Sequence, residues 1–202
     1  MAITSTQQGV ITEAEFAKIA ILTSHGALVP ARPLADDDRR DFEIHIRRRF
    51  TDSLAVQLKT AKRLRLHGRS RVLQINFRLK LPLISDERLW YFLAHFDIKT
   101  MRFTDPVFLI PSRFLHRHAR HGIRRGAMQL QFKASLEANA RDKWSSYRLT
   151  QAELGPRILQ ILEGLQYQAG ASREAADLIA LKGVVWLHQP AVITKTSRRK
   201  AA

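Results

Sequence analysis

The stretch of residues 41–59, DFEIHIRRRFTDSLAVQLK, decides the fold of this chain. Polar and apolar side chains alternate over residues 41–46 and again over residues 54–59, which is the period of two expected of half-buried β-strands. Residues 51–53 (TDS) lie between the two segments and have side chains typical of turns. We therefore predict a β-hairpin over this stretch.

The hairpin would bring an acid, an amide and an amine together at one end of a sheet. Gln57 and Lys59 are two positions apart, so both side chains leave the same face of their strand. Antiparallel pairing would place Asp41 beside the end of the second strand. Carboxylate and amide oxygens can bind Mg²⁺ together with waters and phosphate oxygens, and a nearby lysine can orient a water or stabilise charge on a phosphate. The alternative interpretation is an ordinary polar face of a hairpin.

Asp41 followed by residues 57–59 (QLK) resembles the motif of the PD-(D/E)XK nuclease superfamily, in the variant in which glutamine replaces the second acid. The sequence DFEI followed by VQLKTA is similar to group I intron homing endonucleases of this fold and to related bacterial proteins. The resemblance extends over about residues 10–112. It implies an α/β (α+β) fold with a restriction-endonuclease-like core, in which helices flank a mixed sheet, and we expect a C-terminal helical extension.

The resemblance also implies a metal-dependent site that cleaves DNA. Mg²⁺ (or Mn²⁺) would be bound by Asp41, Gln57 and the backbone at Leu58, and Lys59 would position or activate the attacking water. Gln57 removes one negative charge from the usual pattern, so ion binding should be weaker. Glu43, two residues after Asp41, is a candidate for supplying the missing charge from the same face.

A further acid is expected on the first helix. A helix is predicted over residues 12–24, because Thr12 and Glu15 form a capping-box pattern and Gly26 follows the helix. In the family that the chain resembles, an acid on this helix often approaches the metal, which makes Glu15 the candidate catalytic and metal-binding residue and Glu13 a weaker one. The alternative is that Glu15 only satisfies backbone N–H groups at the helix start.

The composition favours a polyanionic partner. The 202 residues include 34 Lys and Arg against 18 Asp and Glu, a formal net charge of +16. Such an excess favours nucleic acid, with an anionic membrane as a distant second, although phosphate contacts carry no sequence specificity. The absence of cysteine excludes disulfides, thiolate catalysis and zinc–thiolate sites. With no apolar run of about 20 residues and no signal-peptide pattern, we expect a cytoplasmic protein without a membrane partner.

Basic residues cluster around the hairpin and after it. We expect them to form a rim that grips phosphates, the alternative being a solvated charge run. The predicted rim consists of Arg47, Arg48, Arg49, Lys62, Arg63, Arg65, Arg69 and Arg71. Residues 116–121 (HRHARH) are predicted to be a surface basic patch rather than a metal site, because their spacing does not place three imidazoles on one helical face. Residues 36–38 (DDD) are predicted to be a solvated acidic loop.

The remaining elements follow from local patterns. Strands are predicted over residues 72–79, 89–97, 106–110, 127–136 and 184–187. Helices are predicted over residues 111–121 and 173–182, and from the capping box of Thr150 and Glu153 onward. Trp144 and Tyr147 are expected to cover the core, the alternative being stacking on bases. Four segments result: a flexible N-terminus (1–11), a nuclease-like core (12–136), an extension packed on it (137–193) and a disordered basic tail (194–202).

The sequence is compatible with three functions. The first is a Mg²⁺-dependent DNA endonuclease that uses Asp41, Gln57, Lys59 and Glu15. The second is a nucleic-acid-binding module on the same fold that cuts nothing and keeps Asp41 and Lys59 as a structural ion pair. The third is a basic structural or interaction protein. The sequence leaves open the choice between DNA and RNA and the oligomeric state, with a homodimer as one option.

Overall fold

The computed structural model describes residues 3–33, 40–49, 53–68, 70–165 and 184–186. The chain forms three α-helices, α1 (Ser5–Thr23), α2 (Ser112–His118) and α3 (Leu154–Leu165), and two short 3₁₀ helices, η1 (Ser145–Tyr147) and η2 (Gln151–Glu153). Its strands are β1 (Leu28–Ala31), β2 (Phe42–Ile46), β3 (Ser53–Ala61), β4 (Arg65–His67), β5 (Ser70–Lys80), β6 (Leu83–Ser85), β7 (Leu89–Asp97), β8 (Arg102–Pro111), β9 (Arg120–Arg124), β10 (Ala127–Ser135), β11 (Arg148–Leu149) and β12 (Val184–Trp186).

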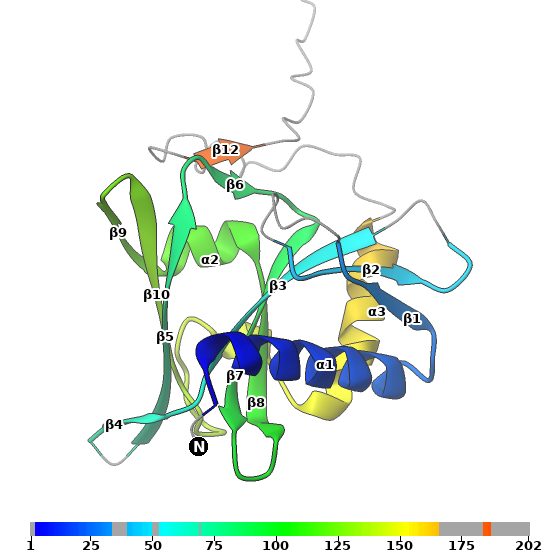
Figure 1. Ribbon diagram of the computed structural model, residues 1–202, viewed down its shortest axis with the longest axis horizontal. Helices are drawn as coiled ribbons and strands as arrows, with labels where there is room; N and C mark the ends of the chain where they lie inside the picture. Colours follow the sequence, from blue (N-terminus) through cyan, green and yellow to red (C-terminus); the bar gives the residue numbers. More distant parts are fainter. Residues whose placement is uncertain (1–2, 34–39, 50–52, 69, 166–183, 187–202) are drawn as a thin grey trace, which may run out of the picture.

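The strands form two larger sheets and one small one (Figure 1). The six-stranded sheet has the order β1-β2-β3-β7-β8-β11, with β3 and β7 parallel and the other neighbours antiparallel. The four-stranded sheet β4-β5-β10-β9 is antiparallel throughout. A short parallel pair joins β6 and β12. The predicted α+β class, a mixed sheet flanked by helices with a helix near the C-terminus, is confirmed.

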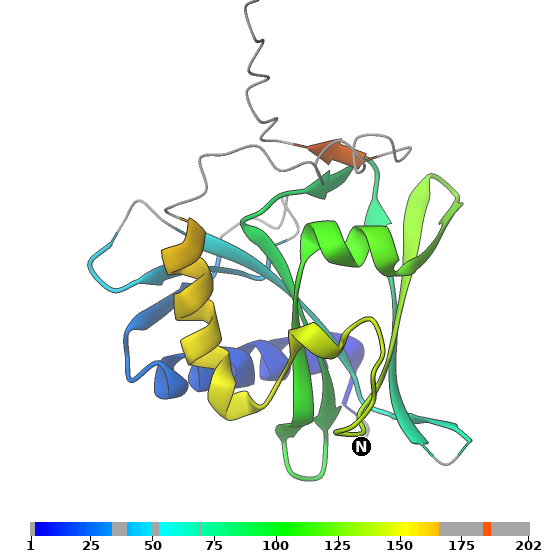
Figure 2. The same ribbon diagram turned by 180° about the vertical axis from the view of Figure 1, so that it is seen from behind.

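Each face of the six-stranded sheet covers its own hydrophobic core. On one face, α1 and α3 pack through residues such as Phe16 and Ile158 against Phe92 of β7. On the other face, the four-stranded sheet and α2 pack against Leu93 and Phe108. Figures 1 and 2 show this separation, with the four-stranded sheet on one side of β7 and β8, and α3 on the other. Burial on both faces explains why β7 is almost wholly apolar.

Most of the predicted strands are confirmed. Residues 89–97 form β7 with the predicted bounds, and residues 72–79 lie within β5. Residues 127–136 correspond to β10, whereas residues 106–110 are the second half of a longer strand, β8. Residues 184–186 form β12. These segments were recognisable because their period and composition are local properties. The predictions for residues 36–38, 173–182 and 194–202 lie outside the described residues.

The predicted start of the first helix is wrong. Helix α1 begins after Thr4, whose capping box with Gln7 replaces the predicted one at Thr12, and residues 5–11, predicted to be flexible, are helical. Thr12 lies inside the helix, where its hydroxyl donates to the carbonyl of Gly9 at 3.1 Å. Two capping patterns follow each other in this sequence. The earlier one is used because the added turns reach the sheet, where Gln8 Nε2 donates to Thr60 Oγ1 at 2.9 Å.

Two predictions about the histidine-rich segment are also wrong. Helix α2 ends at His118 rather than His121, because the chain turns back there as β9 to pair with β10. His116 does not belong to a surface patch, since it is 2% exposed and its ring nitrogens lie 3.0 Å from Tyr91 Oη and 3.2 Å from Ser85 Oγ. A buried imidazole with two hydrogen-bond partners is part of the packing between α2, β6 and β7.

The second half of the chain completes the core. Trp144 is 1% exposed and packs on Phe132, so the prediction that it covers the core is confirmed. The capping box of Thr150 and Glu153 is also confirmed, and it precedes α3. Helix α3 joins the core beneath α1, so the predicted extension shares its hydrophobic core with β2 and β3. Within the described residues, no helix combines the length and hydrophobicity that crossing a membrane requires.

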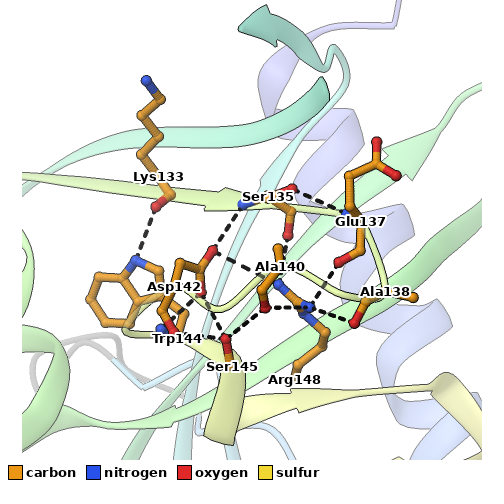
Figure 3. Close-up of polar contacts among 9 residues, drawn as sticks. All are labelled: Lys133, Ser135, Glu137, Ala138, Ala140, Asp142, Trp144, Ser145 and Arg148. Carbon is orange, nitrogen blue, oxygen red and sulfur yellow. Dashed lines mark hydrogen bonds and ion pairs between the residues drawn. The ribbon is translucent and has the colours of Figure 1, made fainter. Parts of the chain in front are cut away.

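The loop between β10 and β11 forms hydrogen bonds to the side chain of one arginine, Arg148 (Figure 3). The guanidinium of Arg148 donates to the carbonyls of Ser135 and Glu137, each at 2.9 Å, and lies 3.8 Å from the carboxylate of Asp142. That carboxylate accepts the backbone N–H groups of Ser135 and Trp144, both at 3.0 Å. The Arg148 side chain is 12% exposed, so these bonds are largely screened from water. The arrangement fixes the loop that carries Trp144 into the core.

Replacing Arg148 by methionine is expected to lower the free energy of unfolding by about 2–3 kcal/mol, because several loop carbonyls and the Asp142 carboxylate lose their partner. Arg148→Lys should recover little of this, since one ammonium cannot span the same carbonyls. Denaturant unfolding measures the change, with the exposed Arg102→Met as the matched control. Equal losses in Arg148→Met and Arg102→Met would contradict this role.

Candidate active site

The predicted hairpin is confirmed and brings Asp41 against the QLK segment. Strands β2 and β3 pair with Phe42 opposite Val56, and the backbone N–H of Asp41 donates to the carbonyl of Val56 at 3.0 Å. The Asp41 carboxylate accepts the backbone N–H of Leu58 at 2.5 Å. The regular pairing ends at Phe42, and this bond fixes the Asp41 carboxylate at the backbone directly after Gln57. A carboxylate from one strand is thereby fixed beside an amide from the next.

Gln57 and Lys59 leave the same face of β3, as the alternation predicted. Leu58, between them, is buried in the core beneath α1, so its two neighbours lie on the opposite face. The parallel register with β7 places Gln57 beside Tyr91 and Lys59 beside Leu93, which both belong to the other core. Gln57 and Lys59 thus lie on the sheet face that the four-stranded sheet and α2 flank, and the Asp41 carboxylate binds the backbone N–H between them.

Gln57 carries an unsatisfied acceptor. The residue is 6% exposed, and its Oε1 is buried without a hydrogen-bond partner in the part of the chain that the structure describes. Leaving such a group unpaired costs about 1–3 kcal/mol, so native structures rarely keep one without a reason. Gln57 directly precedes Leu58, whose backbone N–H binds the Asp41 carboxylate. An amide oxygen without a donor beside a carboxylate fits a hard cation such as Mg²⁺.

Lys59 has an uncommitted ammonium group. It is half-buried and forms no hydrogen bond or ion pair with any residue that the structure describes. The Asp41–Lys59 ion pair that the second interpretation requires is therefore not formed. Because Lys59 leaves β3 on the same face as Gln57, its ammonium can face an incoming anion on that side of the sheet.

Glu15 lies on the other side of the sheet. It is 8% exposed, and its carboxylate forms an ion pair with Lys18 one turn along α1. Because Glu15 lies in the middle of α1, the alternative that it caps the helix start is wrong. The adjacent Phe16 packs on the core face of the sheet, with its ring centroid 5.4 Å from that of Phe42. The role of Glu15 as a metal ligand remains a prediction.

The two other acids considered are engaged elsewhere. Glu43 forms an ion pair with Arg40, and Glu13 forms one with Arg32 at 2.5 Å. Among the described residues, no group of three or more His, Asp or Glu side chains is arranged to hold a metal ion. A cation at this site would therefore depend on Asp41, the Gln57 amide and the backbone at Leu58, with waters and phosphate oxygens completing its shell.

A buried polar chain beside the site was missed by sequence reasoning. Tyr91, the β7 neighbour of Gln57, has its hydroxyl 3.0 Å from His116 Nε2, and His116 Nδ1 lies 3.2 Å from Ser85 Oγ. The three residues come from separate elements, so no local spacing signals their contact. Further along β7, burial lowers the pKa of His95 more than its hydrogen bond to the Lys62 carbonyl raises it. The lowered pKa favours the neutral imidazole of His95, which lies opposite Ala61 on β3.

The predicted basic rim is placed only in part. The exposed members among the described residues are Arg47, Arg48, Arg49, Arg63, Arg65 and Arg71. Lys62 differs, since its Nζ donates to the carbonyl of Ile3 at 2.8 Å and so holds the start of the chain against the end of β3. Arg69 lies outside the described residues. The exposed arginines follow β2 and surround the turn between β4 and β5, where the backbone of Gly68 has a φ of +61°.

No protein-family model and no curated protein matches this chain. Among solved structures, the chain is similar to a bacterial homing endonuclease, I-Ssp6803I, with 14% sequence identity and a TM-score of 0.48. The similarity covers 82% of this chain and 98% of that chain.

Proposed function

We propose that this chain is a metal-dependent endonuclease that hydrolyses phosphodiester bonds in DNA. The observation that carries the proposal is the buried Gln57 Oε1, which lacks a donor and lies beside the fixed carboxylate of Asp41. The uncommitted ammonium of Lys59 leaves the same face of the strand. Two oxygen ligands, from Asp41 and Gln57, can bind a metal ion, and the ammonium of Lys59 can bind a phosphate at the same site.

Each residue of the site would have a distinct role in phosphodiester hydrolysis. Asp41, Gln57 and the backbone at Leu58 would hold Mg²⁺ or Mn²⁺, which when bound polarises the scissile phosphate. Lys59 would donate a hydrogen bond to the attacking water or to the phosphate oxygens as negative charge develops. The hydrogen bond from Leu58 N–H orients the Asp41 carboxylate. A formal net charge of +16 favours the approach of the polyanionic substrate.

A second candidate function is a nucleic-acid-binding module without cleavage. It is favoured by the glutamine at position 57, since the site then has one carboxylate where two would bind a cation more tightly. The excess of basic residues supports DNA binding equally in both cases. The two functions differ in whether loss of Asp41 changes metal binding and cleavage.

The test combines DNA cleavage with direct metal binding. We expect the purified chain to nick supercoiled DNA with Mg²⁺ or Mn²⁺ but not with EDTA. Asp41→Asn should abolish nicking and weaken Mn²⁺ binding, followed by calorimetry, by at least about tenfold. The exposed Glu163→Gln on α3 makes the same charge change and should leave both unchanged. DNA binding without cleavage under every metal, with equal Mn²⁺ affinity in both variants, would favour the second function.

A further inference from the structure

The four-stranded sheet has an outer face that the proposed cleavage site does not use. Its inner face packs into the core through alternate residues such as Leu73, Ile75 and Phe132. The residues between them point away from the six-stranded sheet, and Figures 1 and 2 show no helix over that side of β5 and β10. Among the described residues, no element covers this sheet face, which is therefore available to a partner.

The outer face is basic and contains no acid. Strands β4, β5, β9 and β10 together carry seven Lys or Arg residues and no Asp or Glu, and all seven except Arg71 lie at outward positions. Arg78 and Lys80 of β5, Arg120 and Arg124 of β9 and Lys133 of β10 are all exposed. Uncompensated positive charge over four adjacent strands favours a polyanion.

Amide side chains lie between these cations. The strand register places Gln129 opposite Arg78 and Gln131 opposite both Asn76 and Arg120. Gln131 Nε2 donates to Asn76 Oδ1 at 3.0 Å. Neither Gln131 Oε1 nor Asn76 Nδ2 forms a hydrogen bond to another described residue, so one acceptor and one donor remain for a ligand. This row combines guanidinium and amide groups on one surface.

The row lines a concave surface. A pocket of about 600 Å³ is lined by side chains of the row and by Gly122 in the middle of β9. The side chains are those of Asn76, Arg78, Arg120, Gln129 and Gln131. Gly122 lies opposite Gln129, and a Cβ added there would meet no atom within 4 Å. The missing side chain leaves the middle of the row open, so a ligand edge can reach both amides.

We propose that this outer face reads base edges in the major groove of duplex DNA. Arginine pairs with guanine O6 and N7, and glutamine or asparagine pairs with adenine N6 and N7. Arg78, Gln129 and Gln131 are the base-reading residues, and Arg120, Arg124 and Lys133 contact phosphates. Antiparallel strands enter the major groove in other sheet-type DNA readers. The inference deepens the proposed function by naming how its substrate is recognised.

The outer face fits duplex DNA better than single strands because β5 and β10 carry no outward aromatic ring. Sheets that bind single-stranded nucleic acid stack bases on exposed aromatic rings. The outward positions of β5 and β10 carry Gln, Asn, Arg, Lys, Ala, Ser and the buried Val72, while their aromatic residues, Phe77 and Phe132, point inward. The two central strands of this face, β5 and β10, therefore present hydrogen-bonding groups but no aromatic ring on which bases could stack.

The experiment is a selection from a randomised duplex library by the full chain in EDTA, so that no cleavage is required. The wild-type chain should select a preferred sequence. The double variant Gln129→Met and Gln131→Met should lose discrimination at one or more positions by about 5–100-fold with nearly unchanged binding to random DNA. Arg120→Met should weaken binding to all sequences and lower the salt slope by about 1. Gln160→Met on α3 and the exposed Arg102→Met are the matched controls.

The outcomes separate this inference from the cleavage proposal. Sequence selection that depends on the two glutamines supports the inference even if the chain never cuts DNA. Unchanged selection in the glutamine variant would overturn it even if the chain cuts DNA. Tighter binding of single-stranded DNA or RNA than of duplex DNA would also overturn it, as would the absence of any preferred sequence.

Discussion

Replacing Lys59 by methionine is expected to lower the rate of metal-dependent DNA cleavage by at least about 100-fold, the usual loss when one donor to developing charge is removed. Methionine keeps much of the apolar stem and removes the ammonium. Because Lys59 forms no hydrogen bond or ion pair with a described residue, folding should not depend on its charge. The loss should therefore appear in catalysis rather than in stability.

Single-turnover cleavage of a labelled duplex measures this effect. Lys99→Met, at the exposed turn between β7 and β8, removes the same charge away from the site and should cleave at the wild-type rate. Duplex binding in EDTA should stay within about threefold of wild type, since a single phosphate contact is a small part of the total. If Lys59→Met cuts as fast as Lys99→Met, the catalytic residues lie elsewhere in the chain.

Sequence reasoning succeeded where the information is local. The alternation in residues 41–46 and 54–59 determines which side chains share a face, and turn chemistry between them allows only antiparallel pairing. Gln57 and Lys59 were therefore predicted to share one face of their strand, as the pairing of β3 with β7 shows, whereas the metal site they would form with Asp41 stays a prediction. The apolar run of β7 was equally clear, because a strand buried on both faces has no polar half.

The environment of isolated side chains could not be predicted in the same way. Whether Glu15 faces the site depends on which face of the sheet α1 covers, and that choice is set by tertiary packing of Phe16. His116 has a charged and polar sequence neighbourhood, yet it is buried by contacts with Tyr91 and Ser85 from distant strands. Burial of this kind is a property of the assembled layers, and local composition does not report it.

The outer face of the four-stranded sheet was missed although its signal was present. The local density of arginine and lysine led to the prediction of a phosphate-binding rim at residues 62–71, whereas β5 and β10 have fewer charged side chains per residue. In the two strands together, however, seven of the eleven outward positions are Gln, Asn, Arg or Lys, and none is an acid. These polar residues can be recognised as one surface only when every second residue of β5 is compared with every second residue of β10. The sequence alone does not predict that these two strands pair.

The largest effect on stability is expected at Gly155, where α3 begins against the end of α1. The residue is buried, and its backbone N–H donates to Thr23 Oγ1 at 2.9 Å. A Cβ at this position would lie 2.5 Å from the backbone nitrogen of Ser24 and 2.6 Å from the carbonyl carbon of Thr23. Backbone atoms cannot rotate away as a side chain can, so the two helices must separate.

Gly155→Ala is therefore expected to destabilise the chain by about 3 kcal/mol, at the upper end for overpacking, because the shift also disturbs the contacts of Leu154, Ile158 and Leu162 in the shared core. For a chain of this size the midpoint of thermal unfolding should fall by about 6–12 °C.

Scanning calorimetry measures this change, and Gly164→Ala is the matched control variant. Gly164 lies in the same helix with open space around its Cα, so alanine there should stabilise by up to about 1 kcal/mol. If both variants gain stability, α1 and α3 do not approach each other through Gly155, and the core beneath the candidate site is packed differently.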